Sequence, residues 1–187
     1  NIILVIGYLG EQVVDFFKKL ELGVKITYVT QNEQKGIGHA LLQVERHIQT
    51  RCFVVILGDE LYIGADHSRL IGFADRDFAG VLAFKEESDP KRISKNYIGV
   101  FEGDRVLKLV EKPNRPESNL MGLGSYLLTD KIFYYLKITP KSRLRGEVEI
   151  TDALSNMAES ENVYYVSLNV QYWNVTTKED WNSANYI

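Results

Sequence analysis

Two carboxylates follow directly on an apolar, strand-like run about a third of the way along the sequence. Residues 54–57 are apolar and rich in β-branched side chains, and Gly58, Asp59 and Glu60 come straight after them. Ligands of open α/β sheets bind outside the carboxyl ends of the strands. A carboxylate in that position can hold Mg²⁺, which takes one or two carboxylates together with substrate phosphates. A solvent-exposed turn is the other interpretation of this segment.

A second segment combines glycines with the expected start of a helix. Gln31, Gly36, Gly38 and His39 follow a strand-like run and precede helical spacing. Glycine lets a ligand approach the backbone closely, and the free N–H groups of a helix start favour phosphate or base acceptors. The alternative to a ligand-binding loop is a plain strand-to-helix loop. In that interpretation His39 lies on the helix surface and is not a catalytic base.

A third segment, Glu111-Lys112-Pro113, ends an expected hairpin strand. The following proline restricts the backbone of Lys112, so its ammonium group can offer a fixed positive charge to a phosphate. A surface charge pair is the alternative.

Two later segments have weaker signals. Thr151 and Asp152 can cap a helix, or their segment can meet sugar hydroxyls. Trp173, beside the polar Asn174, can form the wall of a sugar pocket or belong to the core.

The spacing of apolar residues predicts the elements that position these segments. Strand-like runs and helix-like spacing alternate, with strands over 2–6, 24–29, 53–57 and 80–84 and helices over 11–20, 36–48 and 68–75. Such alternation is typical of a parallel sheet with helices on both faces. We therefore predict a three-layer α/β fold with a mostly parallel central sheet, in which the first three strands are adjacent or nearly so.

After residue 85 the pattern changes. Residues 97–102 and 105–110 predict a hairpin around Gly103 and Asp104. A strand over 122–128, helices over 130–136 and 150–160, and a strand over 163–168 follow. The length of 187 residues fits a single domain over 1–187.

Composition excludes several classes of function. The net charge of -3 predicts no general attraction to nucleic acid or to anionic membranes. Apolar runs are too short to span a membrane. A single cysteine, Cys52, cannot form an intrachain disulfide, which favours a reducing, cytoplasmic location.

The order of these segments resembles that of the sugar-1-phosphate nucleotidyltransferases, the family of glucose-1-phosphate uridylyl- and thymidylyltransferases. The resemblance covers the whole chain. The matching segments, in family order, are Gly7-Tyr8-Leu9-Gly10, Gln31 with Gly36, Gly58-Asp59, Tyr97 with Gly99 and Val100, Glu111-Lys112-Pro113, Gly124 with Tyr126, Gly146-Glu147 and Trp173. It implies the nucleotide-diphospho-sugar transferase fold, with a nucleoside triphosphate (UTP or dTTP) and a sugar 1-phosphate, glucose 1-phosphate first, as substrates.

The resemblance also implies a role for each matching residue. Nucleotide binding would fall to Gln31, Gly36 and Gly58. Sugar phosphate binding would fall to Gly99, Glu111, Lys112, Gly124 and Trp173. Asp59 and Asn174 would hold Mg²⁺, and the catalytic residues would be Lys112 and Asp59.

The sequence departs from the family pattern in three ways. The opening strand and its glycine-rich loop with an arginine are absent, so we expect a domain incomplete at its N-terminus, a free sheet edge that invites pairing with another copy, and an inactive isolated chain. Asn174 stands where the family usually has an aspartate, and Ile98 is an extra residue between Tyr97 and Gly99. A non-catalytic nucleotide- or sugar-binding regulatory relative is therefore the alternative. An unrelated nucleotide-binding domain is disfavoured, because no Gly-x-Gly-x-x-Gly or Walker loop occurs.

Overall fold

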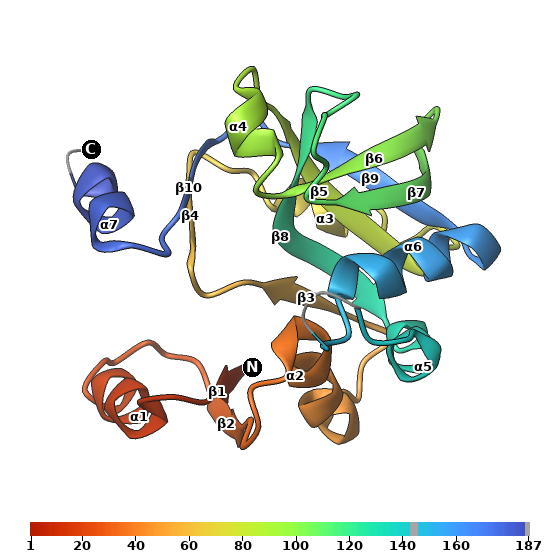
Figure 1. Cartoon of the computed structure of the whole chain (residues 1–187). Helices are drawn as coiled ribbons and strands as arrows, with labels where there is room; N and C mark the ends of the chain where they lie inside the picture. The colour runs from red at the N-terminus through yellow and green to blue at the C-terminus, as the bar shows by residue number, and fades with distance from the viewer. Residues whose placement is uncertain (143–145, 186–187) are drawn as a thin grey trace.

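The first half of the chain folds as alternating strands and helices, as its apolar pattern predicts. A computed structural model describes residues 1–142 and 146–185 (Figure 1). The elements up to the central strand β5 are β1 (Ile2–Ile6), α1 (Gly10–Lys18), β2 (Ile26–Thr30), α2 (Gly36–Val44), the 3₁₀ turn η1 (Glu45–His47), β3 (Cys52–Ile56), β4 (Glu60–Ile63), α3 (Ser68–Ile71) and β5 (Gly80–Glu86). The later elements are α4 (Pro90–Ile93), β6 (Tyr97–Glu102), β7 (Arg105–Glu111), β8 (Leu120–Thr129), α5 (Lys131–Ile138), α6 (Ile150–Ser160), β9 (Val163–Ser167), β10 (Gln171–Asn174) and α7 (Lys178–Ala184).

The main sheet has six strands in the order β3-β8-β5-β9-β7-β6. β8 runs antiparallel to both of its neighbours, β3 and β5. β7 is antiparallel to β9 and to β6, which confirms the predicted hairpin. Among the described strands of this sheet, only β5 and β9 are parallel neighbours. The α/β class is confirmed, whereas the prediction of a mostly parallel sheet is wrong.

The sheet is not mostly parallel because a strand from the second half of the chain, β8, lies between strands from the first half. β3 and β5 point the same way, as two strands joined through a helix should. They are not neighbours, because β8 lies between them and runs the opposite way. β8 is long enough to meet β6 as well, through Ile98 and Met121 at its other end. β6, the last strand in the sheet order, therefore also pairs with β8, the second strand.

Helices cover both faces of the main sheet, which confirms the three layers. Along β5, successive side chains point to opposite faces. Leu82 and Phe84 join the core under α5 and α6. Val81 and Ala83 join a second core under α3 and α4.

The strands β1 and β2 pair with each other in parallel and form a separate two-stranded sheet. Their connecting helix α1 has no buried residue. Among the described residues, β3 is paired on one edge alone, and its Val54 and Ile56 are 43% and 52% exposed. The expected free sheet edge is therefore present, although β3 is not adjacent to β1 or β2.

A short antiparallel ribbon of β4 and β10 lies beside the main sheet (Figure 1). It is tied to α4, because Arg92 Nη2 donates to the carbonyl oxygen of Tyr172 across 2.8 Å. Arg92 also pairs with the buried Glu87 at 3.0 Å. Within the described part of the chain, no helix has the length and apolar character to cross a membrane.

Candidate active site

The predicted carboxylate turn connects β3 to the β4–β10 ribbon. Gly58 and Asp59 form an exposed turn immediately after β3. The next residue, Glu60, starts β4 and lies directly opposite Asn174 of β10. The backbone N–H of Val175 donates to the carbonyl oxygen of Asp59 across 2.7 Å. The pairing of two strands far apart in sequence thus brings Asp59 and Asn174 together.

The carboxylate of Glu60 lies at the centre of this cluster. It accepts hydrogen bonds from the backbone N–H of Gly124 at 2.8 Å, from the hydroxyl of Tyr172 at 2.9 Å and from the hydroxyl of Tyr62. Burial raises the pKa of the Glu60 carboxyl, and these three hydrogen bonds offset only part of that rise. Burial and the nearby charge of Glu60 raise the pKa of Tyr62 and Tyr172, so both hydroxyls remain donors.

Asn174 has a feature that suits a cation ligand. Its Oδ1 is buried and accepts no hydrogen bond from the described residues. A buried oxygen without a donor is costly unless something else satisfies it. The unsatisfied Oδ1 of Asn174 therefore suits a ligand of Mg²⁺, and the exposed carboxylate of Asp59 on the adjoining turn suits a second one. The remaining ligands of Mg²⁺ would be phosphate oxygens and water. Among the described residues, no group of three His, Cys, Asp or Glu side chains could hold a metal by itself.

Lys112 occupies an unusual backbone conformation at the end of β7. Its φ is 44°, which a residue with a side chain adopts only at a cost. Its N–H donates to the carbonyl oxygen of Asn96 across 2.7 Å, and Pro113 follows it buried. The Nζ lies 3.7 Å from Glu111, and the side chain is 40% exposed. The backbone of Lys112 is therefore held by a hydrogen bond and its ammonium group is open to solvent, while the fixed position of that charge stays a prediction.

Glu111 is held by α6. Its Oε2 accepts a hydrogen bond from the Thr151 hydroxyl across 2.8 Å. Thr151 is itself buried in the first turn of α6, and the N-cap of that helix is Glu149. The interpretation of Thr151 as a helix cap is therefore wrong, since its hydroxyl is used to orient Glu111.

The predicted sugar residues lie on several strands. Gly99 is buried in β6, where a side chain would overlap the ring of Phe101. Gly124 lies in β8, and a Cβ there would lie 2.5 Å from Leu57 and 2.8 Å from Glu60. Trp173 pairs with Leu61, so strand alternation places it on the face of the ribbon opposite Asn174. Gly124 thus joins the Asp59 cluster directly, while the contact of Trp173 with a sugar stays a prediction.

The nucleotide segment forms an ordered loop before α2. Gln31 Nε2 donates to the carbonyl oxygen of Gly36 at 3.1 Å and lies 2.9 Å from His39 Nδ1. Gly36 has φ 83°, and a Cβ there would lie 2.6 Å from Glu147 Oε2. His39 is half-buried, and Gln43 lies 3.2 Å from its other ring nitrogen. His39 therefore helps to hold Gln31 and is not a free surface residue.

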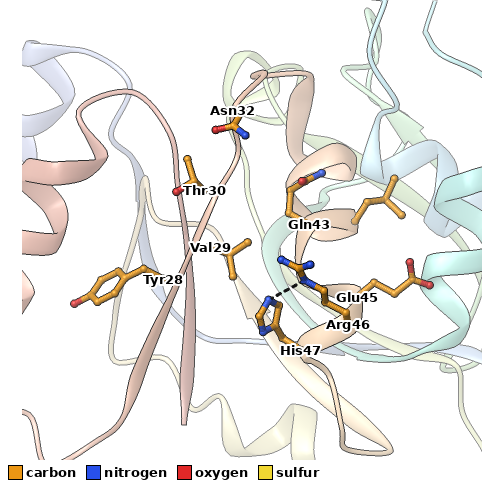
Figure 2. A pocket seen from close by; sticks show the side chains of 9 residues that line it. Tyr28, Val29, Thr30, Asn32, Gln43, Glu45, Arg46 and His47 are labelled. Carbon is orange, nitrogen blue, oxygen red and sulfur yellow. Dashed lines mark hydrogen bonds between the residues drawn. The ribbon is translucent and has the colours of Figure 1, made fainter.

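A cavity of about 600 Å³ lies beside this loop, between β2 and the end of α2 (Figure 2). Thr30 and Asn32, which flank Gln31, line one wall, and Gln43 and Arg46 line the other. None of the residues lining this cavity belongs to the Asp59 cluster.

The comparisons with known proteins agree with this geometry. A central sheet covered on both faces by helices defines an α/β domain, with a carboxylate turn, a glycine loop and a lysine at the ends of strands. The model of the protein family "Nucleotidyl transferase" matches residues 2–181. The chain therefore belongs to the sugar-1-phosphate nucleotidyltransferase family.

Two curated relatives and one solved structure illustrate the similarity. The chain is 34% identical over 161 residues to the UTP–glucose-1-phosphate uridylyltransferase AglF of Haloferax volcanii, covering 86% of this chain and 65% of that protein. It is 32% identical over 174 residues to the bifunctional protein GlmU of Methanococcus aeolicus, covering 93% of this chain and 39% of the relative. A crystal structure of UDP-glucose pyrophosphorylase with UDP-glucose superposes with a TM-score of 0.82 at 26% identity, covering 99% of this chain and 81% of the other. The chain thus spans less than two thirds of the length of these two curated relatives.

Proposed function

We propose that the protein is a nucleotidyltransferase that joins a nucleoside triphosphate and a sugar 1-phosphate to give a nucleoside diphosphate sugar and pyrophosphate. The observation that carries the proposal is the cluster in which Asp59, Gly124 and Asn174 surround one carboxylate. In this cluster the predicted metal ligands Asp59 and Asn174 and the predicted sugar-contacting backbone of Gly124 come from one turn and two separate strands.

The reaction needs positioning and charge neutralisation more than covalent chemistry. A phosphate oxygen of the sugar 1-phosphate attacks the α-phosphorus, a new P–O bond forms, and the bond to the bridging oxygen of the leaving pyrophosphate breaks. Lys112 would neutralise the sugar phosphate, and its fixed backbone would limit the loss of freedom on binding. Asp59 and Asn174 would hold Mg²⁺, whose charge would offset that of the phosphates.

The other residues would select the substrates. Gln31 and Gly36 would contact the base and Gly58 the phosphate-bearing part of the nucleotide. Gly99, Glu111, Gly124 and Trp173 would contact the sugar. Thr151 would keep Glu111 oriented towards it.

We propose UTP or dTTP as the nucleotide, because the amide of Gln31 can pair with uracil and thymine alike. Glucose 1-phosphate is the proposed sugar, supported by the substrates in the names of the related uridylyltransferase and the bound UDP-glucose of the structural neighbour. We place the protein in the cytoplasm, where the free thiol of Cys52 would remain reduced.

A non-catalytic regulatory relative is the second candidate, and Asn174 favours it. A neutral amide oxygen binds Mg²⁺ more weakly than a carboxylate does. The two candidates differ in turnover, not in ligand binding.

The test measures pyrophosphate release by the full-length protein with Mg²⁺, using UTP and dTTP against a panel of sugar 1-phosphates. Turnover in the common enzyme range of about 1–1,000 per second for one pair supports the enzyme. Binding of nucleotide and sugar phosphate without pyrophosphate release for any pair would support the regulatory relative.

A further inference from the structure

The two sides of the proposed site are joined by one half-buried carboxylate, that of Glu60. Glu60 accepts a hydrogen bond from Gly124 on β8 and another from Tyr172 on β10. Its own backbone directly follows Asp59. A single side chain therefore fixes the carboxylate turn, the second strand of the ribbon and the sugar-side backbone relative to one another.

The same network reaches Lys112. The hydroxyl of Tyr172, which donates to Glu60, also lies 3.3 Å from Asn96 Oδ1. The carbonyl oxygen of Asn96 accepts the N–H of Lys112 across 2.7 Å. Tyr172 and Asn96 thus lie between Glu60 and the proposed phosphate-binding lysine, and the single hydroxyl hydrogen of Tyr172 can be given to Glu60 or to Asn96.

Most of the acceptor capacity of the Glu60 carboxylate is taken up by donors of the protein itself. Three donors already engage its two oxygens, and two of these donors are tyrosine hydroxyls fixed within the ribbon. Gly124 approaches so closely that a Cβ there would lie 2.8 Å from the carboxyl carbon of Glu60. There is no room for a hydroxyl group between them.

We propose that Glu60 is a positioning residue, which holds Asp59 and the backbone of Gly124 at the separation that the transfer reaction requires. This inference rests on the proposed function and adds a residue to it. Displacement of a reacting group by about 1 Å can reduce the rate on the order of a hundredfold, so the carboxylate acts through geometry.

Glu60→Gln in the full-length protein is the primary test. Glutamine keeps the shape but has one acceptor oxygen in place of two, so at least one of the three donors loses its partner. We expect kcat to fall about 10- to 100-fold and the KM for the nucleotide to stay within about twofold. Amide hydrogen exchange of Gly124 should accelerate at least about tenfold, with no change at Leu127 and Leu128 of the same strand.

Glu102→Gln is the matched control, because Glu102 is exposed at the end of β6. Tyr172→Phe is the second variant and keeps the charge of Glu60 while removing the link to β10. It should lower kcat about 3- to 10-fold, so the proposal stays testable if Glu60→Gln does not fold.

The outcomes separate this inference from the proposed function. Absence of pyrophosphate release by the parent protein contradicts the proposed function and, with it, the catalytic part of this inference. An active parent with a folded Glu60→Gln or Tyr172→Phe variant of unchanged kcat overturns the positioning role alone. Equal losses in kcat and in nucleotide affinity would also overturn it, because they would indicate general loss of structure.

Discussion

Asn174 lies directly opposite Glu60 in the antiparallel ribbon of β10 and β4, with its own Oδ1 buried and without a donor. Side chains at such paired positions lie on the same face, with Cβ atoms about 4.5–5.5 Å apart. A neutral amide beside a half-buried carboxylate avoids repulsion when no cation is bound.

This relationship predicts the effect of Asn174→Asp. Without Mg²⁺, two carboxylates would face each other, and stability should fall by on the order of 1–3 kcal/mol. Mg²⁺ should restore the stability, since a ligand that binds only the folded state stabilises it. Thermal unfolding with EDTA and with Mg²⁺ measures both effects. Asn182→Asp, on the exposed side of α7, is the control, and a Mg²⁺-independent melting temperature for Asn174→Asp would contradict the metal site.

Lys112 predicts opposite effects on stability and on substrate use. Lys112→Gly removes a side chain from a residue with φ 44°, so stability should rise by about 1 kcal/mol. The same change removes the charge for the sugar phosphate, and the KM for that substrate should rise about 10- to 100-fold. Steady-state kinetics and urea unfolding of the full-length protein measure the two effects. Lys108→Ala, at an exposed position of the same strand, should change neither, and an unaltered KM for Lys112→Gly would remove the proposed role.

We predict that Gly36→Ala weakens nucleotide binding by more than its backbone strain alone would explain. Both Gly36 and Gly23 have positive φ, of 83° and 65°. A Cβ on Gly36 meets Glu147, whereas a Cβ on Gly23 meets no atom of the described residues within 4 Å. Alanine at either position should cost about 1 kcal/mol of stability. Calorimetric titration with UTP should show weaker binding, by about tenfold, for Gly36→Ala alone; equal affinities for the two variants would argue against a nucleotide role of this loop.

Glu87 predicts a pH-dependent contribution to stability. Burial raises its pKa, but the N–H of Asp89 together with Lys85 and Arg92 more than offsets this, so the pKa lies below its usual value. Stability from the ionised group is therefore present above the unfolded pKa of about 4.3 and is lost as pH falls through the lower folded pKa. Glu87→Gln should cost roughly 2–4 kcal/mol at neutral pH, and the difference from the parent should shrink below about pH 4.

Urea unfolding across that pH range tests the prediction for Glu87. Glu86→Gln is the control, because Glu86 is the exposed residue directly before Glu87, at the end of β5. A difference between Glu87→Gln and the parent that stays constant from neutral to acid pH would contradict the role of the ionised carboxylate.

The free edge of β3 predicts self-association of the 187-residue chain. An exposed strand edge with apolar side chains is a template for pairing with another copy. Val54→Thr with Ile56→Thr should shift the chain towards the monomer in light scattering coupled to size-exclusion chromatography. Leu107→Thr changes an exposed position on β7, which has neighbours on both edges, and should leave the oligomer distribution as it was. A monomeric parent chain at high concentration would rule out association through this edge.

Local patterns predicted most elements of the fold but not how the sheet is assembled. The strand predicted over 53–57 and the hairpin predicted around Gly103 each depend on a short stretch of sequence. Both lie close to elements of the structure, β3 and the β6–β7 hairpin. The position of β8 between β3 and β5 depends on partners such as Val55 and Tyr126, which lie far apart along the chain. Periodicity contains no information about which distant strand becomes the neighbour, so the directions within the sheet were predicted wrongly.

In the candidate site too, residues marked by a local pattern were predicted and their long-range partners were not. Asp59 and Lys112 could be selected because they directly follow strand-like runs. The short strands β4 and β10 were missed, since four residues give too little alternation to be recognised. The partners of Glu60 and Glu111 were missed for another reason, because Tyr172 and Thr151 become neighbours only through tertiary packing.

The pairing of β5 also constrains the order in which the protein can acquire its structure during synthesis. Gly80 needs Leu128 on one side and Val163 on the other, so the centre of the sheet cannot close until β9 has left the ribosome. At about 5–20 residues per second, β5 would wait several seconds with its apolar side chains uncovered. β1 and β2 pair with each other across the short connection through α1, so these three elements can form long before that. A nascent chain stalled before β9 should therefore contain an ordered N-terminal unit and an open sheet that depends on chaperones.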